Sequence, residues 1–512
     1  MLVASDFAPL HVSKLTPVFP FTLDDDDLSF QDSDSETSSE GGTGNDGEAI
    51  FELERPDAPE EAPQDETPED PHEPPPATTH SRATPAPSPQ PSSPSSSPAA
   101  TIRYGRGASE PLPANTGEDS SPEHTKYQQA LNSPASNTYH PFQSHLEWEF
   151  ARWAKFRGPS STAVSELLGI EGVVERLGLS FKNPRELNKR IDEELPGHPQ
   201  FHRHNIEVGG EIFEVYFRDI EACIRALFAD PCLSLHLKHA PEKQFADKEK
   251  TIRIYHDIHT GEWWWSTQEL LDTDIGEGRT IIPIIISSDK TQLTLFRNKA
   301  VYPLYMTIRN IPKELRRKPS FRAYVLLGYL PTSRLSHTTC KAARRRCLSN
   351  LYHTCLERIL HPLQVAGEEG IKVSDGFGMV RHCHPIFATF IGDYPEQVLI
   401  TGVIYGDCVK CPIPKDQLGD PQPDPGGRSL KTIMDLLDNF DHTGGSYVQF
   451  TRGCKDARLK PIVAPFWDGL AYAHVYWSIT PDIMHQLYQG VMKHMVGWLA
   501  KVYGAAEIDA CC

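Results

Sequence analysis

An apolar run at residues 281–286 constrains this chain most, because it ends in two serines and the single acid Asp289. A run that is so short and so rich in β-branched side chains predicts a strand buried on both faces of a sheet. Open α/β sheets bind their ligands at the carboxyl ends of the strands. We therefore expect Asp289 at a functional sheet edge, where a second acid should join it.

A second strand with the same character ends in Gly392 and Asp393. Between the two strands the pattern predicts further strands at 292–297, 300–309 and 322–330, and a helix at 337–362. This order, a strand ending in Asp, a meander, a helix and a strand ending in Asp, is that of an RNase H-like mixed sheet flanked by helices. The first and fourth strands of that fold are adjacent and parallel, so we expect Asp289 and Asp393 within a few ångström of each other.

Two such carboxylates repel each other unless divalent cations lie between them. The pair therefore predicts a site for Mg²⁺ or Mn²⁺, of the two-metal kind that cleaves phosphodiesters. The alternative is that each aspartate only caps a turn. Asp375 is a competing acid, although the following Gly376 makes it a strong turn signal.

A motif typical of zinc follows at Cys408-x2-Cys411-Pro412, which supplies half of a tetrahedral set. The best partner for the two thiols is His485, which shares a helix face with Asp482 three residues earlier. Thr480 and Pro481 predict the start of that helix, which should run to about Tyr503. The alternatives are two incidental thiols and an acid that only stabilises the helix dipole. Other candidate zinc ligands are His442, Cys454 and His474.

The acidity of the chain lies entirely in its first part. Residues 1–140 carry 25 acidic and 6 basic side chains, whereas residues 141–512 carry 44 of each. The whole formal net charge of −19 therefore lies in residues 1–140. Residues 1–140 also hold 21 of the 44 prolines, so we expect a disordered acidic tail rich in Pro and Ser. The neutral remainder is compatible with nucleic-acid binding. No apolar run reaches the length of a membrane helix, and 11 cysteines are too few for a disulfide scaffold, which favours an intracellular protein.

The domains expected after this tail are a mainly helical region (141–275), the RNase H-like core (276–411), a loop-rich insertion (412–478) and a C-terminal helix (479–512). Within the helical region we expect amphipathic helices at 145–195 and 213–227, and a strand and turn packed against a helix in 253–271. The three tryptophans at 263–265 would pack in the core or stack on bases. The basic clusters at 316–318 and 341–346 would contact phosphate, act as nuclear import signals or form a solvated face.

Four blocks in order resemble the fungal Plavaka transposases, relatives of the CACTA cut-and-paste family, over roughly residues 140–503. They are residues 283–294 around Asp289, residues 392–397 around Asp393, Cys408-x2-Cys411-Pro412, and Asp482-x2-His485 through Gly490. The resemblance implies an RNase H-like nuclease with a DDE/D acid set and Mg²⁺-dependent cleavage and transfer of double-stranded DNA at transposon ends. It makes Asp289 and Asp393 the first and second acids.

The chain departs from the family pattern at both ends. Residues 1–140 contain no zinc-finger-like segment, and the chain stops soon after the Asp482 helix, before the expected third acid. A C-terminally truncated copy is therefore expected, in which Asp482 or Glu507 is the only substitute in the chain.

Three functions follow from these observations. The first is a metal-dependent DNA transposase in the nucleus, either active or inactive because the chain is truncated. The second is a non-catalytic relic that binds DNA or chromatin, and the third is a zinc-stabilised interaction protein. An oligomer is compatible with each of them.

Overall fold

The computed structural model describes residues 98–105, 107–113, 139–156, 160–195, 199–294, 299–333, 335, 338–418, 426–438, 447–504 and 507–508. Most of the predicted tail 1–140 therefore lies outside the described residues. Within it, Ala100–Arg103 form strand β1, which pairs with β4. The Tyr104 hydroxyl next to this strand donates a hydrogen bond of 2.7 Å to Asp272, so this segment is joined to the folded part.

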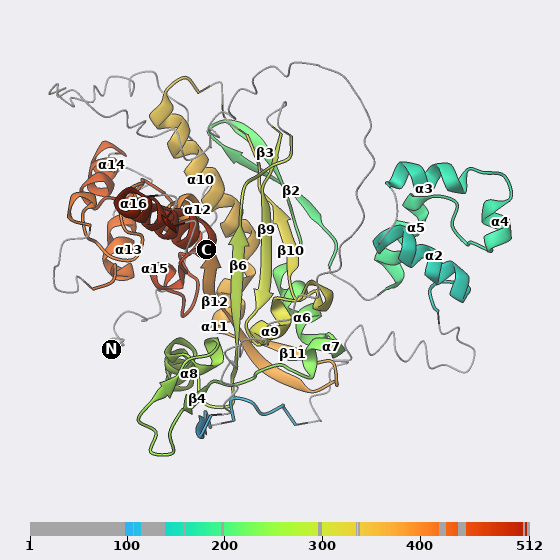
Figure 1. Ribbon diagram of the computed structural model, residues 1–512, viewed down its shortest axis with the longest axis horizontal. Helices are drawn as coiled ribbons and strands as arrows, with labels where there is room; N and C mark the ends of the chain where they lie inside the picture. The colour runs from blue at the N-terminus through green and yellow to red at the C-terminus, as the bar shows by residue number, and fades with distance from the viewer. Residues whose placement is uncertain are drawn as a thin grey trace, which may run out of the picture.

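A seven-stranded mixed sheet flanked by helices forms the centre of the molecule (Figure 1), in the order β11-β12-β6-β9-β10-β3-β2. A three-stranded sheet (β1-β4-β5) and a two-stranded one (β7-β8) accompany it among the described residues. The strands are β1 (Ala100–Arg103), β2 (His202–Val208), β3 (Glu211–Phe217), β4 (Glu242–Phe245), β5 (Arg253–Ile254), β6 (Thr280–Ser288), β7 (Thr291–Gln292), β8 (Ala300–Val301), β9 (Pro303–Ile308), β10 (Val325–Tyr329), β11 (Ile371–Ser374) and β12 (Val380–Ile391).

The connectivity around β6 confirms the predicted fold class. β6 pairs antiparallel with β9, which pairs antiparallel with β10, while β12 lies parallel to β6 on its other side. The first and fourth strands of the RNase H-like order are thus adjacent and parallel. Residues 281–286 are buried throughout, as a central strand covered on both faces requires.

The helices cover this sheet and extend beyond it. They are α2 (His145–Phe156), α3 (Ser161–Leu168), α4 (Val173–Leu177), α5 (Pro184–Glu194), α6 (Ile220–Ala229), α7 (Pro231–Ser234), η3 (Ile258–Thr260), α8 (Glu262–Asp274), α9 (Lys313–Arg316), η4 (Pro319–Phe321), α10 (Lys341–Leu360), α11 (Pro362–Glu368), α12 (Tyr394–Thr401), η5 (Lys415–Gln417), α13 (Leu430–Asp438), α14 (Tyr447–Asp456), α15 (Val475–Ser478), the π-helix η6 (Ile483–Met492) and α16 (Lys493–Tyr503). Helices α2 to α5 have a small core of their own around Phe181 and Leu187. No helix of the described residues combines the length and the apolar character that crossing a membrane requires.

One local prediction in the region 141–275 is wrong. The helix expected at 213–227 begins only at Ile220, where Asp219 caps it, because Phe213 and Val215 alternate with exposed residues in strand β3. The segment 253–271, expected as a strand and turn packed against a helix, contains strand β5, the short helix η3 and most of helix α8, with Trp263–Trp265 in the first turn of α8. Trp264 and Leu271 lie on the buried face of this helix, which confirms core packing for Trp264.

Two other predictions change at segment ends. The C-terminal helix is capped by Asp482 and not by Thr480, because the Asp482 carboxylate accepts hydrogen bonds from the backbone of Met484 and His485. Of the strand expected at 292–297, Thr291 and Gln292 form β7, and residues 295–298 lie outside the described residues.

Candidate functional site

The carboxyl ends of β6 and β12 bring the two predicted acids to one sheet edge. Ser287 pairs with Ile391 in the parallel register, so Asp289 and Asp393 both stand two residues beyond the same pair. Neighbouring strands lie about 4.8 Å apart. Asp289 is exposed, whereas Asp393 is half-buried. The two strand ends that carry these acids are therefore adjacent in the fold.

Helix α12 starts directly at the second acid. The Asp393 carboxylate accepts a hydrogen bond of 3.0 Å from the backbone N–H of Glu396, as the N-cap of that helix, and Pro395 stands in the first turn. Asp393 therefore caps helix α12 through one carboxylate oxygen, the structural role that the alternative interpretation gave it.

A third segment reaches the same edge from the C-terminal part. Ile479 forms a parallel bridge with Phe390 in β12, and Thr480 donates to the Phe390 carbonyl from its backbone N–H and its hydroxyl (3.3 and 3.1 Å). The buried Gln397 amide donates to the carbonyls of Gly392 and Thr480 (2.9 and 3.1 Å). These bonds fix the segment that leads to Asp482 against the end of β12.

Asp482 and His485 form a close pair at the start of η6. The Asp482 carboxylate lies 2.5 Å from His485 Nδ1 and accepts the His485 backbone N–H at 2.8 Å. Burial opposes ionisation of Asp482, but these hydrogen bonds outweigh it and lower its pKa. Asp482 therefore carries a full negative charge beside the sheet edge.

Two other aspartates influence the pKa of Asp393. Burial raises the pKa of Asp393, and the charges of Asp289 and Asp482 raise it further, whereas the Glu396 N–H and His485 lower it. Like charges raise a carboxyl pKa in this way only when they are near. Asp289, Asp393 and Asp482 are called the acid cluster from here on.

Sequence reasoning missed a fourth acid beneath this cluster. Glu396 is buried, and its carboxylate accepts hydrogen bonds of 2.6 Å from both Ser288 and Tyr302. Burial raises the pKa of Glu396 to about 7, and the charges of Asp393 and Asp289 add to the effect. Glu396 thus links the residue before Asp289 to the helix that follows Asp393. The available signal was its place three residues after Asp393, one turn along a helix.

The acid cluster fits a hard divalent cation in its donor chemistry. Mg²⁺ is commonly held by one or two carboxylates, with waters and substrate phosphates completing its shell. Asp289 and Asp393 supply such carboxylates, and their mutual repulsion is the kind that a bound cation relieves. No three His, Cys, Asp or Glu side chains of the described residues lie close enough to hold an ion by themselves. Ligands from water or substrate would have to complete the shell.

Only half of the predicted zinc site is present among the described residues. Cys408 and Cys411 are hydrogen-bonded to each other, and the Arg428 guanidinium donates to the Cys408 carbonyl at 3.0 Å. Burial opposes ionisation of the Cys408 thiol, but Cys411, the nearby backbone N–H groups and Arg428 lower its pKa. His485 is engaged with Asp482. The described residues do not complete a tetrahedral set, and zinc binding stays a prediction.

The other candidate ligands and acids have structural roles or lie outside the description. His474 stacks on Trp477 at 4.0 Å, and Cys454 is buried in the main core. Asp375 is buried in an ion pair of 2.7 Å with Arg381 and caps its own turn. His442 lies outside the described residues.

The comparison with known families decides the ancestry of this chain. The family model of the Plavaka transposase matches residues 181–499. The chain belongs to the Plavaka transposase family. The matched range includes the whole seven-stranded sheet and every member of the acid cluster. A search of curated proteins gave no match.

Membership in the Plavaka family gives a transposon-derived transposase as the class of the protein.

Proposed function

We propose that this Plavaka protein is a DDE/D transposase of the CACTA type that cleaves and transfers DNA strands at its acid cluster with Mg²⁺ or Mn²⁺. The observation that carries the proposal is the parallel register of β6 and β12, which puts Asp289 and Asp393 two residues beyond one strand pair. The substrate proposed is double-stranded DNA at transposon ends, and the proposed compartment is therefore the nucleus.

The residues have distinct roles in this proposal. Asp289 and Asp393 would hold the cations, which would help to deprotonate the attacking water or DNA 3′-hydroxyl and stabilise the leaving oxygen. Asp482 serves as the third acid, and His485 orients its carboxylate through the 2.5 Å contact. Glu396 positions the cluster from below through Ser288.

Metal-dependent nicking of supercoiled plasmid tests the proposal without knowledge of the transposon ends. We expect nicking by the wild type with Mn²⁺ or Mg²⁺, and a loss of at least about 100-fold in Asp289→Asn and Asp393→Asn, because each variant removes a charged metal ligand. The matched control is Asp456→Asn, an exposed acid at the end of α14.

Equal background nicking in all four proteins would contradict the catalytic proposal. That result, with DNA binding intact, would favour the non-catalytic relic instead.

A further inference from the structure

A basic segment between β9 and β10 is not used by the proposed chemistry. Residues 309–324 contain six basic side chains and one acid. An open pocket of about 390 Å³ lies here, lined by Arg316, Arg317, Lys318, Pro319, Arg322, Ala323 and Tyr324. This is called the basic pocket. It lies at the opposite end of the sheet from the acid cluster, because the backbone N–H of Arg309 donates to the Pro283 carbonyl near the start of β6.

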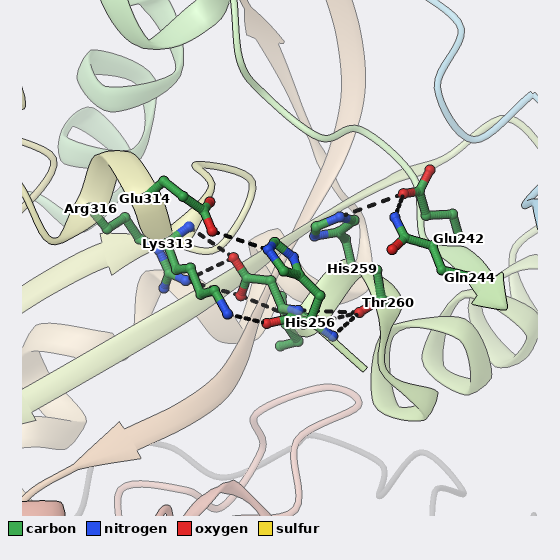
Figure 2. A network of polar contacts seen from close by, with 10 residues as sticks. Glu242, Gln244, His256, His259, Thr260, Lys313, Glu314 and Arg316 are labelled. Atoms are coloured by element: carbon green, nitrogen blue, oxygen red, sulfur yellow. Dashed lines mark hydrogen bonds and ion pairs between the residues drawn. The ribbon is translucent and has the colours of Figure 1, made fainter. Parts of the chain in front are cut away.

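One wall of the pocket is a buried cation held rigidly in place. Arg316 is only 9% exposed, and its guanidinium donates to both carboxylate oxygens of Asp257 at 3.1 and 3.3 Å. Figure 2 shows Arg316 and Lys313 reaching from α9 toward the turn at residues 256–260. Lys313 donates to the His256 carbonyl at 2.6 Å, and Glu314 pairs with His256 at 3.1 Å. The acids near the pocket are therefore already engaged, with Asp257 on Arg316 and Glu314 on His256.

The remaining positive charge faces the opening. Arg317 and Lys318 are exposed, and no carboxylate of the described residues forms an ion pair with either. The buried Nε atoms of Arg309 and Arg316 have no hydrogen-bond partner among the described residues. Burial and the neighbouring Arg316 lower the pKa of Arg309 to about 10. Several cationic side chains thus lie close together here, and some of their N–H groups have no hydrogen-bond acceptor. A bound anion stabilises such an arrangement.

We propose that the basic pocket binds a backbone phosphate of nucleic acid and anchors DNA away from the acid cluster. Arginine forks and lysines are the side chains that neutralise such phosphates. Six residues of β6 and the following turn separate Pro283 from Asp289, a span of about 20 Å. That span corresponds to roughly six base pairs of duplex. The identity of DNA as ligand rests on the proposed function, whereas the phosphate chemistry rests on the pocket alone.

DNA-binding affinity in metal-free buffer tests the anchor separately from cleavage. Fluorescence anisotropy with duplex DNA of arbitrary sequence should show roughly tenfold weaker binding for Arg317→Ala/Lys318→Ala at about 0.1 M salt. The slope of log affinity against log salt should also fall, by up to about two, because two cationic side chains that neutralise the DNA backbone are lost. Both side chains are exposed, so the thermal unfolding midpoint should not change.

Two controls separate this proposal from its alternatives. Arg185→Ala/Lys189→Ala on α5 makes the same charge change on exposed residues and should leave the affinity within about twofold. Asp456→Asn on α14, which belongs to neither the basic pocket nor the acid cluster, should bind DNA like the wild type even if the wild type proves inactive in nicking.

An equal loss in both double variants, or no loss in either, would overturn the proposal. Binding of inorganic phosphate is measured on the same proteins. If Arg317→Ala/Lys318→Ala no longer binds inorganic phosphate but keeps the wild-type affinity for DNA, the pocket is a free-anion site and the nucleic-acid assignment is wrong.

Discussion

Glu396 shows at the scale of a single residue how the fold prepares the acid cluster. Its carboxyl group is buried between the hydroxyls of Ser288 and Tyr302. Lys460 lies near enough for Glu396 to raise its pKa, although burial lowers that pKa to about 8 overall. The residue couples the two acid-bearing strand ends, and its protonation should be visible in the stability of the whole protein.

The Glu396→Gln variant should change the pH dependence of stability. The folded pKa of about 7 exceeds the usual 4.5, so the folded chain keeps a proton that the unfolded chain loses between these values. Wild-type stability should therefore fall as the pH rises from 4.5 to 7, by at most about 3 kcal/mol. The variant should lack most of this fall. Urea unfolding at several pH values measures it, and an unchanged pH profile would contradict the assignment.

Asp393 gives a second prediction at the residue scale. Its raised pKa lets protons compete with a cation at higher pH than for an ordinary aspartate. As the pH is lowered, Mn²⁺ affinity should therefore begin to weaken at a higher pH than for a site of ordinary aspartates, and His485→Ala should strengthen this effect because it removes a group that lowers the pKa of Asp393. Titration calorimetry at two pH values measures both. An affinity that is equal at the two pH values would exclude Asp393 as a ligand.

At the scale of elements, the segment from Ile479 to Gln486 completes the site by docking on the end of β12. Gln397 is the centre of this docking, since it donates to Gly392 and Thr480 and accepts from Gln486 at 3.1 Å. These bonds act together with the Ile479–Phe390 bridge and the Thr480 hydrogen bonds to hold the segment at the end of β12.

The Gln397→Ala variant should loosen the third acid. We expect a loss of about 2 kcal/mol in the free energy of unfolding, because buried partners lose their hydrogen bonds. Nicking activity should fall, although the register of β6 and β12, which positions Asp289 and Asp393, does not change. The control is Gln449→Ala, an exposed residue of α14. If the two variants behave alike, Gln397 does not hold the segment.

Element periodicity also explains what could be predicted from the sequence. Residues 281–286 and 386–391 are both short apolar runs. Their pattern and their order along the chain predict two adjacent parallel strands, with Asp289 and Asp393 just beyond the strand ends. The start of α6 was misplaced because Phe213 and Val215 fit a helix and a strand equally well. Glu396 carries no local sign of its burial, because the hydroxyl of Tyr302 that binds it comes from a distant part of the chain.

At the scale of the whole molecule, one continuous core surrounds the strands that carry the acids. Ile284 is fully buried and pairs with Phe387 in β12 and Ile308 in β9. It therefore connects both neighbours of β6, and packing at this point supports the register on which the acid cluster depends.

The Ile284→Ala variant should cost about 2–5 kcal/mol of unfolding free energy, because it leaves a cavity at the centre of the sheet. Ile212→Ala changes the same side chain at a position that is 68% exposed and should cost less than about 1 kcal/mol. Chemical unfolding of the two variants measures the difference. Similar losses would show that β6 is not the central strand.

Mn²⁺ binding measured by titration calorimetry on purified protein tests the central claim most directly. We predict binding to the wild type and to Asp456→Asn, and its loss in both Asp289→Asn and Asp393→Asn. Each variant should be at least as stable as the wild type in metal-free buffer, since removal of one like charge relieves repulsion. If either cluster variant binds Mn²⁺ as tightly as the wild type, the two aspartates do not form a shared cation site.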